Sequence, residues 1–477
     1  MGGKLSAALD PDQAPDASAV ASPEARPSRK RLPAGRHGLA RVELTLAAIL
    51  GVAFLLRAAW IAIADPQPDS IYCGDPFFYD AFGRFLAAGK GFIQVNGQPT
   101  AQWPPGYPAM LAVIFKLLGH KIILAKLLNV LLGTATCLVA YLIGRKLFSR
   151  GAGLIAAAVL AVFPGQVFSP TLLMSEVPAT FLVATFVCLV AYFAVDSLSW
   201  RLAAAVGAFI GLISFVRGET IFLALPLVVV WAVATRSVAS GLRYGAVALA
   251  ATGLVISPWV VRNWVTMGYP ILMSTGSGEN LIAGHWSGAD GKGSFVPILE
   301  VDYKYEGVPF PKAETLIYKE ETRRALSFAV HNPLTELKLI PQKLYEFYRS
   351  DGKVMLWIQK GTLDDPAFGK SAEARWEALA NVYYWIALAV AVIGAPLWFS
   401  RRDARKLLPL MVVLYYSFLF GFVFIGEQRF HSALIPLLSV FAAMSAVAGV
   451  ERLRRAFATP VRPESGEAVL SASGEEA

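Results

Sequence analysis

The chain has 477 residues, of which 56 % are hydrophobic and only 16 % are charged, and its mean hydropathy is +0.52. Because soluble domains contain about a quarter charged residues, this composition excludes an ordinary soluble enzyme, a disordered chain and a nucleic-acid-binding protein. The net charge of +9 does not indicate nucleic acid, since the basic residues cluster beside long apolar runs. Three cysteines cannot form a disulfide framework.

The N-terminal segment, residues 1–42, is rich in Pro, Ala, Ser and Asp and becomes strongly basic toward its end. This composition predicts a disordered tail on the cytoplasmic side of a membrane. The first apolar run, 44–64, ends in Ala62-Ile63-Ala64, which resembles a signal-peptidase site. The tail and the apolar run are both long for a signal peptide, so we favour an uncleaved anchor.

The later apolar runs are oriented by the positive-inside rule. If the run at 104–118 crossed the bilayer, the basic loop 144–150 would face outward, so we predict that 104–118 is an interfacial helix. Every later basic loop then falls inside. The predicted spans are 44–64, 122–144, 151–166, 175–195, 202–216, 220–235, 244–261, 378–400, 407–425 and 431–450.

These spans predict an all-α polytopic membrane protein with about ten transmembrane helices and both termini inside. Interfacial helices are expected in the first outer loop, and helical periodicity is visible near 314–330 and 333–348. The predicted parts are a disordered basic cytoplasmic tail (1–42), a first membrane part (43–261) that includes the catalytic first outer loop (65–120), an outward-facing soluble cap (262–376), the last membrane spans (377–455) and a disordered cytoplasmic tail (456–477).

Charged residues gather at the outer ends of the spans, whereas the centres of the second to tenth spans hold almost none. A secondary transporter would place ionisable groups near the bilayer midplane, often in duplicated halves, and the sequence shows neither. The pattern therefore favours a membrane enzyme that works at the outer interface. A carrier for amphiphiles is the leading alternative, and a non-catalytic assembly subunit is a third.

Two acidic residues at predicted helix starts are the candidate catalytic groups. Asp75 stands directly before Pro76, so it either caps a helix that begins there or acts as a general base held above the bilayer. Glu176 stands at the start of the fourth span, where the helix dipole favours an acid. Capping is the alternative interpretation for both carboxylates.

Three arginines lie at outer boundaries, where the positive-inside rule does not call for positive charge: Arg217, Arg262 and Arg429. A cation at such a place needs a partner, either a carboxylate or a phosphate. We expect at least one of the three to bind phosphate. His431, beside Arg429, either assists this binding or is an interface residue.

Several short motifs, taken in order, carry a family resemblance. They are Tyr79 after the first-loop acid, Gly89-Lys90-Gly91-Phe92, Pro104-Pro105-Gly106-Tyr107-Pro108, residues 141–148 (YLIGRKLF), Leu172-Leu173-Met174-Ser175-Glu176, residues 258–263 (PWVVRN) and Arg429-Phe430-His431. In this order they resemble the polyprenyl-phosphate-dependent membrane glycosyltransferases of the C-type (GT-C) fold. The nearest resemblance is to the bacterial protein mannosyltransferase-like branch, akin to the lipid A aminoarabinose and galacturonic acid transferases, and it spans about residues 44–455.

The resemblance implies an inverting transfer of a sugar from a polyprenyl-phosphate donor to a lipid, polysaccharide or protein acceptor. The active site would face the periplasm from a multi-pass protein of the inner (cytoplasmic) membrane, as in lipopolysaccharide and cell-envelope assembly. An outward site cannot use cytosolic nucleotide sugars, whereas a lipid-linked sugar reaches it through the bilayer. A flippase of lipid-linked sugars is the corresponding form of the carrier alternative.

The resemblance also implies roles for individual residues. Asp75 matches the first-loop acid, which acts as base or helps to hold a divalent cation, but Pro76 replaces the second acid of many relatives. No cofactor is implied with certainty, and a divalent metal at Asp75 stays open. Glu176 matches the second catalytic acid. The expected donor-phosphate and substrate-binding residues are Arg429, Arg262, Lys126, Arg217, His431, Tyr79 and Tyr107.

Overall fold

The computed structural model describes residues 36–360, 368–400 and 402–457. Most of the two tails predicted to be disordered, 1–42 and 456–477, therefore lies outside the described residues. The chain divides into residues 1–43 and a compact unit from Leu44 onward, and the arrangement below concerns the second unit. Its described residues form helices and one isolated β-bridge, between Ile93 and Pro99.

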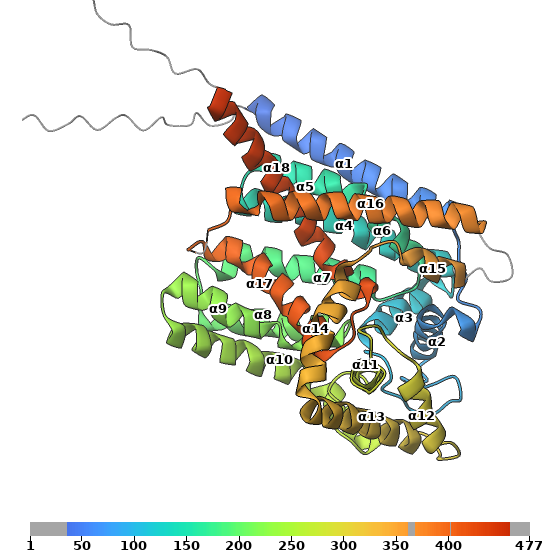
Figure 1. Ribbon diagram of the computed structural model, residues 1–477. Helices are drawn as coiled ribbons and strands as arrows, with labels where there is room; N and C mark the ends of the chain where they lie inside the picture. Colours follow the sequence, from blue (N-terminus) through green and yellow to red (C-terminus); the bar gives the residue numbers. More distant parts are fainter. Residues whose placement is uncertain (1–35, 361–367, 401, 458–477) are drawn as a thin grey trace, which may run out of the picture. The chain divides into compact units, whose positions relative to one another are not determined.

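Within the described part of the chain, eight helices are long and apolar enough to cross a membrane, and a bent helix pair makes a ninth candidate. Helix α8 (Trp200–Ser214) is apolar but shorter. Together these elements correspond to the ten predicted spans, and the chain is a multi-pass, all-α membrane protein (Figure 1). The other span elements are α1 (Arg36–Ile63), α4 (Ile122–Leu147), α7 (Glu176–Leu189), α9 (Ala224–Thr235), α10 (Val238–Met267), α16 (Lys370–Gly394), α17 (Ala404–Phe418) and α18 (Ile435–Phe457).

The bent pair consists of α5 (Arg150–Ala161) and α6 (Pro164–Phe168), which meet at 62°. Pro164 starts α6 because proline lacks the N–H that would continue α5. The buried Arg57 of α1 lies at the end of α5, where its guanidinium donates to Ala161 O at 3.1 Å and to Leu160 O at 3.3 Å. Leu160 O also accepts the Phe163 N–H. The arginine that interrupts the first apolar run thus closes this helix end.

The two ends of the helices differ in charge, as the positive-inside rule predicts. At one end, Asp196 after α7 pairs with Lys146 of α4 at 3.2 Å and with Arg405 of α17 at 2.7 Å. These contacts bring three predicted cytoplasmic connections together. The candidate site lies at the other ends of the same helices.

The first outer loop folds into α2 (Asp75–Ala87) and α3 (Gly106–Leu118). The short apolar α3 occupies the run that was predicted to be interfacial, and it packs against α2 and the end of α8. At its start, the Gly106 N–H donates to Phe215 O at 2.6 Å, and a Cβ at Gly106 would lie 2.6 Å from that oxygen. A glycine is therefore required where α3 meets α8.

The long outer segment contains α11 (Gly276–Gly284), α12 (Val296–Lys304), α13 (Lys312–His331), α14 (Pro333–Tyr348) and α15 (Val354–Lys360). Helices α13 and α14 match the two stretches of predicted periodicity. The boundaries differ from the prediction, because α10 continues past 261 and α16 starts before 378. Helix α14 is held against the spans, since Tyr348 Oη lies 2.6 Å from Ser417 Oγ of α17.

Candidate functional site

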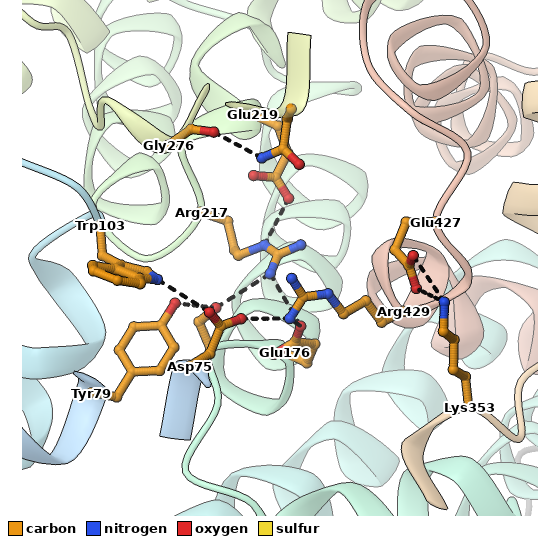
Figure 2. A network of polar contacts seen from close by, with 12 residues as sticks. Asp75, Tyr79, Trp103, Glu176, Arg217, Glu219, Gly276, Lys353, Glu427 and Arg429 are labelled. Atoms are coloured by element: carbon orange, nitrogen blue, oxygen red, sulfur yellow. Dashed lines mark hydrogen bonds and ion pairs between the residues drawn. The ribbon is translucent and has the colours of Figure 1, made fainter. Parts of the chain in front are cut away.

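Four charged side chains from distant parts of the chain meet at the outer helix ends (Figure 2). Asp75 is the first residue of α2 and Glu176 the first residue of α7. Arg217 precedes the short 3₁₀-helix η4 (Gly218–Phe222), and Arg429 lies in η7 (Gln428–Leu434), which leads into α18. Helix and loop ends thus aim all four side chains at one place, which we call the charge network.

Asp75 and Arg429 form the shortest contact of the charge network. Asp75 Oδ2 lies 2.5 Å from Arg429 Nη1, and Asp75 Oδ1 accepts from Trp103 Nε1 at 3.3 Å. Gly74 precedes Asp75 with φ of 71°, and a Cβ there would lie 3.0 Å from Trp357. The N-cap position of α2 is occupied by Gly74, so Asp75 is not the N-cap residue that the capping interpretation expected, and its side chain contacts Arg429 and Trp103 instead.

Glu176 lies between the two arginines. Its Oε1 is 3.3 Å from Arg217 Nη1 and 3.7 Å from Arg429 Nη1. Its Oε2 is buried and has no hydrogen-bond partner. An unpaired buried carboxylate oxygen is costly, so this atom is poised to accept a hydrogen bond from a ligand.

Arg217 is held by more contacts than Arg429. Its Nε donates to Glu219 Oε1 at 2.7 Å and its Nη1 to Ser175 Oγ at 3.3 Å. Burial alone would lower the pKa of Arg217, but the charges of Glu219 and Glu176 outweigh burial and raise it. The Phe430 ring lies 5.0 Å from the Arg217 guanidinium and 5.1 Å from that of Arg429, which fixes both planes.

Tyr79 and Tyr107 lie behind the charge network. Tyr79 Oη donates to Ser175 Oγ at 3.1 Å, and Tyr107 Oη lies 3.1 Å from Asn129 Nδ2. Both tyrosines are almost fully buried, and burial raises the pKa of each above its ordinary value. They are therefore neutral supports that position Ser175 and α3.

Three predicted binding residues lie outside the charge network. Lys126 is buried against Asp65 and the Pro66 carbonyl. Arg262 lies inside α10, not at a loop start, and donates to Thr100 O at 2.6 Å and to Phe92 O at 2.8 Å. His431 is held by Phe347 O and the Asp351 carboxylate and lies 1 % exposed. Their contacts are structural ties.

A narrow cleft opens beside the charge network. Its volume is about 40 Å³. Its polar wall contains the acids Glu176 and Asp351 and the cations Lys353 and Arg429, and apolar residues line the rest: Leu172, Met174 and Val177. The cleft thus combines apolar side chains with charges of both signs.

Four residues around the site were not anticipated from the sequence. Trp357 of α15 stacks on Arg429 at 4.8 Å, and Lys353 pairs with Glu427 at 2.9 Å. Asp351, which lines the cleft, has a buried Oδ2 without a partner. Glu219 fixes Arg217. Three of them, Asp351, Lys353 and Trp357, lie within the seven residues 351–357, and Glu219 lies two residues after Arg217. Nothing in the sequence pairs these positions with the acids and arginines of the charge network.

The geometry around Asp75 does not fit a divalent metal. Among residues 36–360, 368–400 and 402–457, no three His, Cys, Asp or Glu side chains converge as metal ligands. The nearest carboxylates, Asp75 and Glu176, both contact one guanidinium nitrogen of Arg429. The chemistry below is therefore derived from protein groups alone.

Residues 102–261 match the family described as dolichyl-phosphate-mannose-protein mannosyltransferase. This segment includes Glu176 and Arg217 but neither Asp75 nor Arg429. A search of curated proteins finds no match.

Two solved structures are similar. The Archaeoglobus fulgidus oligosaccharyltransferase AglB, in complex with an inhibitory peptide and a dolichol-phosphate, is 15 % identical with a TM-score of 0.47, over 86 % of this chain and 51 % of that one. ArnT from Cupriavidus metallidurans, bound to undecaprenyl phosphate, is 16 % identical with a TM-score of 0.42, over 87 % and 80 %. The chain thus spans about half the length of the oligosaccharyltransferase. The predicted resemblance is confirmed by the family match over residues 102–261.

Proposed function

We propose that the chain transfers a glycosyl group from a polyprenyl-phosphate-linked donor to an acceptor hydroxyl. The reaction takes place at the outer face of the cytoplasmic membrane, and the acceptor is a lipid, a polysaccharide or a protein. The observation that carries this proposal is the contact between Asp75 and Arg429 at the mouth of the cleft. A base and a phosphate-binding cation are placed side by side where the spans end.

Asp75 is the general base in this reaction. Its two oxygens have room for about four hydrogen-bond donors, and the described contacts are those to Arg429 and Trp103. One lone pair of Oδ1 therefore accepts the proton of the acceptor hydroxyl. The hydroxyl oxygen forms its bond to the anomeric carbon while the bond from that carbon to the phosphate oxygen breaks, so the configuration inverts.

Arg429 and Arg217 stabilise the departing lipid phosphate. Preorganised cations act most strongly on charge that develops in the transition state, and a planar guanidinium matches phosphate oxygens. The Arg429 guanidinium exchanges its partner Asp75 for phosphate, whereas Arg217 stays paired with Glu219. Glu176 Oε2, the unpaired oxygen, receives a sugar hydroxyl.

The competing function is a carrier for lipid-linked sugars. A carrier needs the arginines to bind phosphate but has no use for a base beside them. The contact of Asp75 with both Arg429 and Trp103 therefore favours the transferase.

The experiment is mass spectrometry of envelope lipids and glycans from a strain that lacks the chain. The strain is complemented with the wild type, with Asp75→Asn, or with Asp69→Asn as control. Asp69 is an exposed acid of the same outer loop, outside the charge network. The proposal predicts that the wild type and Asp69→Asn restore a missing sugar and that the inserted Asp75→Asn protein does not. Full restoration by Asp75→Asn would reject the base.

A further inference from the structure

A second cavity, separate from the cleft, lies between the first outer loop and helices α11, α12 and α13. Its volume is about 370 Å³, counted as space wide enough for the centre of a water molecule. Gln102 contributes from the first outer loop, next to Trp103. We call this space the acidic cavity.

The lining of the acidic cavity is rich in carboxyl groups and has no cationic side chain among its described residues. It includes Glu279 of α11, Asp302 of α12, Glu306 after α12, and Glu314 and Glu321 of α13. None of its described lining residues is Lys or Arg. The nearest cation recorded for these carboxylates is Arg262, which acts on Glu314.

The carboxylates differ in how well they are satisfied. Glu314 accepts from Thr100 Oγ1, Thr275 Oγ1 and the Ala101 N–H, all at 2.8–2.9 Å, so it is a structural residue. Glu321 is only 1 % exposed, and its Oε1 is buried without a hydrogen-bond partner. Such an oxygen is rare unless a ligand or water completes it.

The backbone also leaves room for the Glu321 carboxylate. A Cβ at Gly278 of α11 would lie 2.7 Å from Glu321 Oε2. The absence of a side chain at Gly278 therefore allows the unpaired acid to stand in the cavity wall. Gly278 of α11 and Glu321 of α13 thus form a packed wall that leaves one buried carboxyl oxygen free for a ligand.

The acidic cavity adjoins the charge network. Glu279 Oε1 accepts from Gln102 Nε2 at 3.2 Å, and the next residue, Trp103, donates to Asp75. The charge of Asp75 acts on Glu279. Asp75 is therefore linked to the cleft through Arg429 and to the acidic cavity through Trp103 and Gln102.

We propose that the acidic cavity binds a primary ammonium group of the acceptor, with Glu321 and Glu279 as its ligands. The binding site is argued from the cavity itself, whereas its assignment to the acceptor rests on the proposed transferase function. A ligand held there by its ammonium group would present a neighbouring hydroxyl to Asp75. Organic cations fit better than a bare metal ion, since no three acids of the described residues converge on one point.

The protonation of the cavity supports a cationic ligand. Burial raises the pKa of Glu321 to about 9 and that of Glu279 to about 7, and it also raises the pKa of Asp302 and Glu314. Tyr318 faces the same space, and burial raises its pKa as well. An ammonium group ionises these acids and releases protons, so its affinity increases as pH rises toward about 7, the pKa of Glu279, and toward about 9, the pKa of Glu321.

The test is a binding measurement on the full chain purified in detergent. The probe is 1,4-diaminobutane, and 1,4-butanediol is its neutral match in length. The matched control variant is Glu300→Gln, because Glu300 is an exposed acid of α12 that does not line the cavity. Titration calorimetry in buffers of different ionisation enthalpy reads both affinity and proton release.

We expect the diamine to bind about tenfold more tightly than the diol, with proton release, since one charge-assisted contact contributes about 1.5–3 kcal/mol. Glu321→Gln should weaken binding of the diamine about tenfold or more. Glu300→Gln should bind the diamine as tightly as the wild type does. If Glu321→Gln does not fold, Glu279→Gln replaces it, with the same expected loss.

Equal binding of diol and diamine would overturn the proposal, and so would an unchanged affinity in the folded Glu321→Gln protein. Magnesium ions that bind in the same place and exclude the diamine would also overturn it, in favour of a metal site. Because the readout needs no sugar transfer, its result is independent of the proposed function. If the diamine binds but Asp75→Asn still restores the missing sugar, only the assignment to an acceptor is lost.

Discussion

Replacing Arg429 with glutamine should selectively weaken binding of a polyprenyl phosphate. Arg429 is the cation at the mouth of the cleft whose main partner, Asp75, can be exchanged for phosphate. In Arg429→Gln, an incoming phosphate instead faces Asp75 and Glu176 without their shared guanidinium. The substitution therefore removes an attraction and exposes a repulsion.

The magnitude follows from the contacts. A hydrogen bond to a charged group contributes about 1.5–3 kcal/mol, and a partly exposed ion pair such as Asp75–Arg429, which must first be given up, costs about 0–1 kcal/mol. The net loss of about 0.5–3 kcal/mol corresponds to a decrease in affinity of about 2- to 150-fold. Undecaprenol, which lacks the phosphate, should bind both proteins alike.

The matched control is Arg262→Gln. Arg262 lies at the same membrane boundary, but its guanidinium is taken up by the carbonyls of Phe92 and Thr100. Its loss should lower thermal stability and change the affinity for undecaprenyl phosphate by less than about twofold. Microscale thermophoresis in detergent measures both lipids. Equal weakening by the two variants, or none by Arg429→Gln, would refute the assigned phosphate site.

Three further predictions concern stability in detergent. Arg217→Met removes the shared partner of Glu176 and Glu219, whose side chains are only 10 % and 15 % exposed, so the free energy of unfolding should decrease by about 3–5 kcal/mol. The double variant Arg217→Met/Glu219→Gln should recover part of this loss of stability. Additive losses in the double variant would contradict the pairing. Arg57→Leu removes the donor of Ala161 O at the end of α5, whereas Leu160 O keeps the Phe163 N–H. The variant should therefore lose about 1–3 kcal/mol for the one carbonyl left unpaired, which urea unfolding measures; an unchanged midpoint would show that water replaces the guanidinium. Burial raises the pKa of Glu321 to about 9 from 4.5, so the folded state retains a proton that the unfolded state releases, and the melting temperature should fall as pH rises toward 9. Glu321→Gln should flatten this pH dependence of the melting temperature. An equally steep dependence in the variant would assign it to other groups.

The membrane architecture was predictable because hydropathy and positive-inside charge act locally. The ten apolar runs and the interfacial run at 104–118 each correspond to a helix. The ends were less predictable: α10 continues past Pro258 and Arg262 to Met267 and ends at Gly268, whose φ is 70°. The break between α5 and α6 needed a partner, Arg57, from another helix.

The candidate site was predictable only in its acids and part of its cations. Asp75 and Glu176 were identifiable as acids at the starts of helices predicted to end outside. Arg217 and Arg429 were identifiable as cations where the positive-inside rule does not call for positive charge. The same reasoning also selected Arg262, because charge at a boundary does not reveal whether a guanidinium meets a carboxylate or a backbone carbonyl. Trp357, whose ring supports Arg429, lies in a segment without any pattern.

The central claim is that this chain carries out glycosyl transfer with Asp75 as base. The most direct measurement incubates purified wild type and Asp75→Asn in detergent with polyprenyl-phosphate-linked sugars and acceptors extracted from the strain that lacks the chain. Mass spectrometry then follows free polyprenyl phosphate and glycosylated acceptor. The account predicts that the wild type forms both products together and that Asp75→Asn is slower by about 10²- to 10⁴-fold, the contribution of a general base. Because a detergent solution offers no membrane for a carrier to cross, product formation there identifies an enzyme. The absence of product from folded wild-type protein, or equal rates for the two proteins, would contradict the account.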